Sequence, residues 1–263
     1  PVRAPQPAPA LAPAPAPAPV PVPVTTPEPA FDPLALSAEV ERVLAGFECA
    51  RLSSTVAPDR RVFVSGSVAR AADVARVQAA LQGLPQVRQV VADVGVLEWP
   101  FCELLAVVES LTPPQAAGRG PRLELSHASG QYREGEFLVV GATAGQAFDG
   151  YLYVLYVDNA GDLVHMLPSP SRTRNSVRAG QKLVLGGEPS AGAETARQYE
   201  IVPPHGRGMV IALHSRRPLF DRDRPEVENV RAYLPALQAR LERLQGAGAA
   251  EVVATSTFLT TRP

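Results

Sequence analysis

The segment from Gly150 to Pro168, GYLYVLYVDNAGDLVHMLP, constrains the fold most, because it predicts a hairpin of two strands with no polar face. Alternate residues of a strand point to opposite faces. The two faces of the first strand carry Tyr151, Tyr153 and Leu155 on one side and Leu152, Val154 and Tyr156 on the other. A strand that is apolar on both sides must be covered on both sides.

Two interpretations of this hairpin are open. In the first, a facing sheet covers one side and a helix expected at residues 225–245 covers the other, so that no ligand is needed. In the second, Tyr151, Tyr153 and Tyr156 line an aromatic ligand pocket. We favour the packing interpretation and keep Tyr151 and Tyr153 as candidate ligand-binding residues.

Strand-like segments recur at short intervals through residues 122–263, with Gly, Asn and Pro between them. This spacing is typical of a β-sandwich or a jelly-roll-like fold. One helix is expected among the strands, in PEVENVRAYLPALQARLERLQG, and Pro235 is expected to kink it. Its apolar stripe consists of Val230, Tyr233, Leu234, Leu237, Leu241 and Leu244.

Residues 34–112 predict a small α/β unit. The helix LSAEVERVLAGF has Ser37 as its expected N-cap, and the strand RRVFVSGSV has a turn or a bulge expected at Gly66. The helix AADVARVQAALQGL, a strand in QVRQVVADVGVLEW and the short helix CELLAVVESL follow. Proline and glycine between residues 112 and 121 mark the expected boundary to the β-sandwich.

Residues 1–33 form a Pro/Ala-rich tract. Proline at nearly every second position fixes φ and removes backbone donors, which excludes helix and sheet. The tract is expected to be disordered or extended, a spacer of about 90 Å at about 3.1 Å per residue. A PxxP ligand for an SH3-like groove is the less favoured alternative. Because the chain starts at Pro1 without Met or a leader-like segment, we expect it to be a fragment of a longer protein, with a processed protein as the less favoured alternative.

Composition excludes several classes of function. A net charge of −1 gives no field to attract nucleic acid, and no run of eighteen apolar residues predicts a membrane span. The two cysteines and four histidines show no metal-site spacing, so we expect neither a metal nor another cofactor.

Two resemblances extend this reading. The segment VFVSGSVARAADVARVQAALQGLPQVRQVVADVGV resembles a BON domain, although Gln86 stands where that family has glycine. With its flanking FECARL and WPFCELL, it is similar to the versions in bacterial envelope proteins and in the extracytoplasmic tails of bacterial serine/threonine kinases.

Residues 133–185 and the segment GRGMVIALHSRRPLF resemble a β-rich domain of unknown function that follows bacterial kinase or caspase-like domains. The shared elements are the strand from Gly150 to Tyr153, the turn from Asp158 to Gly161, the strand end at Leu167 and Pro168, and the segment from Gly208 to Leu219. Neither family supplies catalytic residues, and the kinase landmarks themselves are absent.

The expected fold is therefore α+β: a BON-like α/β domain followed by an antiparallel β-sandwich with one packed helix, after a Pro/Ala-rich linker. The resemblances imply a non-catalytic sensor or interaction region of a bacterial envelope protein, the C-terminal part of a serine/threonine kinase. It would be periplasmic or extracytoplasmic and tethered by an anchor outside this chain. The alternatives are a stand-alone envelope or secretion-system accessory protein and a hydrolase.

The candidate site residues follow from these expectations. Arg172, Arg174 and Arg178 lie in one basic loop and could bind an envelope protein or an anionic envelope ligand; the competing interpretation is a solvated turn. A hydrolase could use Asp158, His165 and Ser169, or His214 with Ser215, although no GxSxG motif surrounds a serine.

Cys49 and Cys102 are expected to form a disulfide, because each lies at an end of the same small unit. Such a unit buries little surface and gains much from a cross-link. The bond would agree with an oxidising compartment. Two buried free thiols are the alternative.

Overall fold

The computed structural model describes residues 31–112, 118–187, 198–245 and 252–263. The tract expected at residues 1–33 thus lies almost wholly outside the described residues. Its last residue begins the first helix, α1 (Pro33–Leu44). Proline suits the first turn of a helix, because it lacks only an N–H that would be unpaired there. Ser37 therefore lies inside α1, and the prediction that it caps the helix is wrong.

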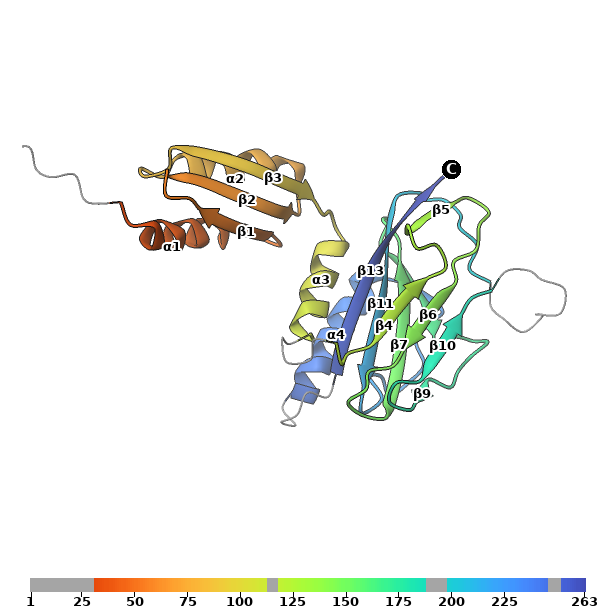
Figure 1. The fold of residues 1–263 in the computed structure, drawn as a ribbon. Helices are drawn as coiled ribbons and strands as arrows, with labels where there is room; N and C mark the ends of the chain where they lie inside the picture. The colour runs from red at the N-terminus through yellow and green to blue at the C-terminus, as the bar shows by residue number, and fades with distance from the viewer. Residues whose placement is uncertain (1–30, 113–117, 188–197, 246–251) are drawn as a thin grey trace, which may run out of the picture. The chain divides into compact units, whose positions relative to one another are not determined.

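The α/β unit continues with β1 (Arg51–Val56), β2 (Arg61–Val68), α2 (Ala71–Gln82) and β3 (Gln89–Val96). Its sheet has the order β1-β2-β3, antiparallel between β1 and β2 and parallel between β2 and β3 (Figure 1). The buried residues of the sheet and of the two helices include Leu36, Val40, Val62, Val64, Val77 and Leu81. Strand β1 was not predicted, because RLSSTV is rich in serine and threonine and is only partly buried.

Gly66 neither ends β2 nor forms a bulge, which corrects the prediction. Gly66 lies opposite Leu52 of β1 and Val94 of β3, and the register is unbroken in both pairings. The glycine is required because its φ is 129° and a Cβ there would lie 1.9 Å from the carbonyl oxygen of Arg51. Glycine thus lets the β1 backbone approach β2 closely.

A disulfide joins Cys49, which follows α1, to Cys102 on α3 (Phe101–Ser110), with the two Cα atoms 5.8 Å apart. The expected bridge is therefore present in the structure. Helix α3 buries Phe101, Cys102, Leu104, Val107 and Val108, and these side chains belong to an apolar cluster that continues into the β-rich part of the chain.

The β-rich part contains two sheets. The smaller sheet has the order β10-β6-β4 and consists of β10 (Lys182–Leu185), β6 (Val140–Thr143) and β4 (Arg122–Leu125). The larger sheet has the order β12-β8-β7-β11-β13-β5, with β9 paired to β7. Its strands are β5 (Gln131–Arg133), β7 (Gly150–Val157), β8 (Asp162–Leu167), β9 (Ser176–Val177), β11 (Arg207–Ser215), β12 (Val227–Asn229) and β13 (Val252–Arg262). All pairs are antiparallel except β13 with β5.

The two sheets and one helix explain the apolar hairpin. Leu152 and Val154 of β7 pack in a cluster with residues of β6 and β10, on the side of the smaller sheet (Figure 1). Tyr153 and Leu155 pack on the opposite side, in a cluster with α4 (Val230–Gln245). The packing interpretation is confirmed, and so is the α+β class with a β-sandwich and a packed helix.

Helix α4 begins later than predicted. Residues 227–229 form β12, which pairs with β8, and the helix starts directly after it. Pro235 lies inside α4, and the helix continues through it. The strand expected in RQYEIVPP is reduced, over its described residues, to one isolated bridge between Phe137 and Glu200.

Candidate ligand-binding pocket

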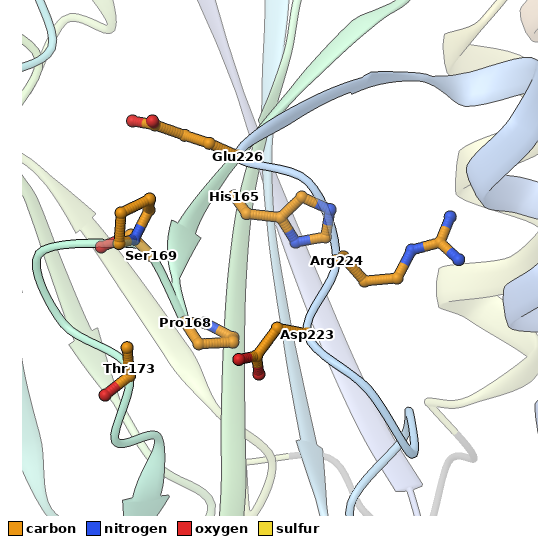
Figure 2. Close-up of a pocket in the computed structure, with 8 residues that line it drawn as sticks. His165, Pro168, Ser169, Thr173, Asp223, Arg224 and Glu226 are labelled. Carbon is orange, nitrogen blue, oxygen red and sulfur yellow. The ribbon is translucent and has the colours of Figure 1, made fainter.

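A pocket of about 140 Å³ lies between the segment that follows β8 and the segment that precedes β12. Its lining residues are His165, Pro168, Ser169, Pro170, Thr173, Asp223, Arg224 and Glu226. Figure 2 shows His165 between these two segments, with Pro168 and Asp223 on one side of its ring. The two segments lie together because β8 pairs with β12, with Val164 opposite Val227.

The wall of the pocket contains a buried group of charged and polar side chains. His165 Nε2 lies 2.8 Å from Glu228 Oε1, and their side chains are only 3% and 8% exposed. Arg224 binds the same carboxylate with two nitrogens, Nε donating to Oε1 at 2.9 Å and Nη2 donating to Oε2. His165 and Glu228 are diagonal neighbours on adjacent antiparallel strands, which places both side chains on one face of the sheet.

This group fixes the charge state of each member. Burial lowers the pKa of His165, and the hydrogen bond with Glu228 offsets this only in part, so the imidazole is neutral near neutral pH. Burial by itself would raise the pKa of Glu228, but the hydrogen bonds from Arg224 and His165 outweigh it and lower the pKa. Glu228 is therefore a carboxylate, which can only accept hydrogen bonds.

The ring nitrogens of His165 have distinct roles as a result. Because Glu228 accepts, Nε2 must carry the proton and donate, and Nδ1 of the neutral ring keeps its lone pair. No described residue forms a hydrogen bond with Nδ1. In Figure 2 one ring nitrogen of His165 faces the side of the pocket where Pro168 and Asp223 lie. The pocket thus contains an oriented, uncharged acceptor.

The serine and histidine residues expected for a hydrolase are not hydrogen-bonded to each other in the described part of the chain. Ser169 lines the pocket, but its hydroxyl pairs with the Ser171 hydroxyl at 3.2 Å. Asp158 accepts from the backbone N–H groups of Ala160 and Asp162, both at 2.9 Å, and so shapes the β7–β8 turn.

The residues of the second serine–histidine pair, His214 and Ser215, also have separate hydrogen-bond partners. His214 Nδ1 accepts a hydrogen bond from the Gly145 N–H at 3.1 Å, and its ring stacks on Phe148. The Ser215 hydroxyl donates to the Arg217 carbonyl at 2.7 Å. Both residues are fully buried.

The arginine loop, residues 172–178, borders the pocket at one end. Arg172 and Arg174 flank the lining residue Thr173, whereas Arg178 lies beyond β9 and its backbone N–H donates to the Gln181 side chain at 2.9 Å. All three arginines are exposed, and none forms an ion pair with a residue that the structure describes. Arg172 makes one long contact, 3.4 Å from Nη1 to the Val184 carbonyl.

The candidate tyrosines lie elsewhere. Tyr153 is buried, its hydroxyl accepts from the Leu219 N–H at 2.8 Å, and burial raises the pKa of its phenol. Tyr151 is partly buried against the same cluster. Neither tyrosine lines the pocket.

Sequence reasoning missed the acidic side of the pocket. The segment HSRRPLFDRDRPE contains charges of both signs, and its Arg224 pairs with Glu228, which lies just beyond the segment. A pattern of alternating charges gives no signal of which carboxylate lines a cavity and which pairs with a buried histidine, so Asp223 and Glu228 could not have been selected.

Two further observations bear on the class of site. The described residues contain no group of three or more His, Cys, Asp or Glu side chains placed to hold a metal ion. In the same part of the chain, no helix has both the length and the apolar character needed to span a bilayer.

Residues 131–218 match the model of a family described as a domain of unknown function, DUF4384. No curated protein matches the chain. The matched region runs from β5 to a point just after β11, which agrees with the expected β-rich domain of unknown function. It includes His165 and the loop from Pro168 to Thr173, whereas Asp223, Arg224 and Glu228 lie beyond it.

Proposed function

We propose that this chain is a non-catalytic interaction region of a bacterial envelope protein, and that it binds an anionic envelope ligand or an envelope protein through the arginine loop. The observation that carries the proposal is the pair of exposed guanidinium groups, Arg172 and Arg174, beside the pocket-lining residue Thr173. Guanidinium groups without carboxylate partners are suited to carboxylates and phosphates, which they bind with two parallel hydrogen bonds.

The location outside the cytoplasm is supported by the disulfide between Cys49 and Cys102. Disulfides persist mainly in oxidising compartments. A BON-like identity of the α/β unit is supported by the order of β2 with Gly66, α2 and β3, which is the order of the segments that carry the resemblance.

We further propose that a serine/threonine kinase domain and one apolar helix precede this region in the full-length protein, as the resemblances imply. A stand-alone envelope or secretion-system protein is the alternative, and it would have a signal peptide instead. Reading the coding sequence upstream of residue 1 distinguishes the two.

The binding proposal predicts that replacing Arg172, Arg174 and Arg178 together with alanine weakens binding to anionic probes. The probes are phosphatidylglycerol vesicles, which carry phosphate, and soluble peptidoglycan fragments, which carry carboxylate. Each lost charged hydrogen bond is expected to reduce affinity by roughly tenfold or more. Binding is measured by co-sedimentation for the vesicles and by calorimetry for the fragments.

The matched control removes the same charge elsewhere, with Arg122, Arg133 and Arg262 changed to alanine. These side chains are exposed on β4, β5 and β13. Equal loss of binding in both triple variants would mean that net charge alone acts. If the loop variant keeps full affinity for every probe that binds, the loop is a solvated turn.

A hydrolase remains the second candidate, because His165 is oriented by a carboxylate and shares its pocket with Ser169. Serine hydrolases also use a histidine that a carboxylate orients. Labelling of the protein by a fluorophosphonate probe, lost in Ser169→Ala, would favour the hydrolase over the binding proposal. We expect no labelling, because the hydrogen bond of Ser169 goes to Ser171.

A further inference from the structure

We propose that the pocket beside His165 binds a primary ammonium group, with His165 Nδ1 and the Asp223 carboxylate as its acceptors. This inference goes beyond the proposed function, because it concerns a cationic group and a different set of side chains. A ligand that carries both an ammonium group and an acidic group could use the pocket and the arginine loop together.

The ring of His165 is held in one orientation. The side chain is only 3% exposed, and Nε2 is held by Glu228, which Arg224 holds in turn. A rigid ring held in this way presents Nδ1 to the pocket as a fixed acceptor. An unpaired acceptor that faces a cavity gains most from a ligand that donates a hydrogen bond.

The guanidinium group of Arg224 is not available to a ligand in the pocket. The one guanidinium group in its lining, that of Arg224, is already bound to Glu228 and lies over the rings of Phe220 and Tyr233. Figure 2 shows this guanidinium directed away from Asp223. The Arg224 charge is therefore compensated inside the protein and is not offered to a ligand.

The carboxylate of Asp223 has a charge that no described residue compensates with an ion pair. Asp223 lines the pocket and forms no ion pair with any residue in the described ranges. In Figure 2 its carboxylate points toward the space next to Pro168. A carboxylate and a neutral imidazole acceptor together favour a ligand that is both positively charged and rich in N–H donors.

The volume of the pocket limits the size of the ligand. A volume of about 140 Å³ is close to that of a cavity of about 150 Å³ that takes up benzene. The rings of Pro168 and Pro170 provide apolar contact for a few methylene groups. The ammonium end of a short alkyl chain fits this combination, as on a lysine side chain or a small amine. A quaternary ammonium group has no N–H and cannot donate to Nδ1.

The test uses the whole chain at neutral pH with n-butylammonium as the probe and tetramethylammonium as its matched control. Nitrogen NMR of the histidine rings measures the chemical shift of His165 Nδ1 during the titration. We expect n-butylammonium to move this resonance along a saturating curve, because it donates a hydrogen bond to that nitrogen. Tetramethylammonium should leave it in place.

Asp223→Asn, at an exposed position, should weaken n-butylammonium binding roughly ten- to a hundredfold, as expected for a lost charged hydrogen bond. Asp221→Asn is the matched control, since Asp221 is exposed and does not line the pocket. The proposal is overturned if n-butylammonium leaves His165 Nδ1 unmoved, if both cations act alike, or if the two variants weaken binding equally.

The arginine-loop variant separates this inference from the proposed function. Replacing Arg172, Arg174 and Arg178 should not weaken n-butylammonium binding, because the variant removes positive charges from beside a cation site. If the pocket binds amines but no anionic probe binds the loop, the inference stands and the proposed function fails; the reverse result has the opposite meaning.

Discussion

Two buried histidines of the β-sandwich are held in the same tautomer, with the proton on Nε2, by different hydrogen bonds. His165 donates through Nε2 to Glu228, whereas His214 accepts through Nδ1 from the Gly145 N–H. The neutral ring of His214 therefore carries its proton on Nε2, which is buried and has no partner among the described residues. Protonating Nδ1 would break the bond to Gly145 and bury a charge, and burial accordingly lowers the pKa of His214 to about 4.

This pKa predicts a pH-dependent loss of stability. Between its unfolded value near 6.5 and its folded value of about 4, the unfolded chain binds the proton and the folded chain does not. The free energy of unfolding should therefore fall by about 3 kcal/mol as the pH falls through this window. His214→Gln removes this contribution, so urea unfolding at several pH values should show a shallower decline for the variant.

His127→Gln is the control for this prediction, because the His127 side chain is 40% exposed. The decline that His214 causes should persist in this variant. A wild-type decline that persists in His214→Gln would show that other groups cause it.

At the scale of elements, the disulfide ties the end of the first helix to the helix that packs on the β-sandwich. Cys49 follows α1, and Cys102 lies in the first turn of α3. The α/β unit itself has only three strands and two helices, and a small unit has a limited core. A cross-link over 53 residues restricts the unfolded chain of this unit and so stabilises the folded form.

Replacing both cysteines with alanine should lower the free energy of unfolding by about 4 kcal/mol on the chain-entropy model. Thermal unfolding of the variant and of the wild-type protein measures the change. The wild-type protein in a reducing agent should melt near the variant. If oxidised protein and variant melt together, the bridge adds no stability.

At the scale of the whole molecule, the same disulfide connects the structure with the proposed location. A cytosolic protein would keep both thiols reduced. Protein isolated from its native cells, alkylated without reduction, should therefore have a mass two hydrogens lower than the reduced form. Digestion should give one cross-linked peptide that contains Cys49 and Cys102. Two alkylated thiols would contradict the proposed location as well as the bridge in the cell.

The fold followed largely from local patterns in the sequence. The alternation in β7 and the helical stripe of α4 predicted two covered faces and the helix that covers one of them, because side-chain periodicity follows directly from backbone geometry. Where this reasoning failed, pairing with another strand was responsible. Strand β1 forms on the neighbouring strand β2, and residues 227–229 become a strand because β8 lies beside them.

The candidate site depended on the tertiary structure. The sequence by itself identified His165, Ser169 and the three arginines as polar residues in or near loops. It could not select Glu228, which is 63 residues from His165 and reaches it through the register of β8 and β12. It also could not tell that Arg224 is neutralised within the protein while Asp223 faces a cavity. Which charges are paired and which are left for a ligand depends on distances between side chains, and only the folded chain sets those distances.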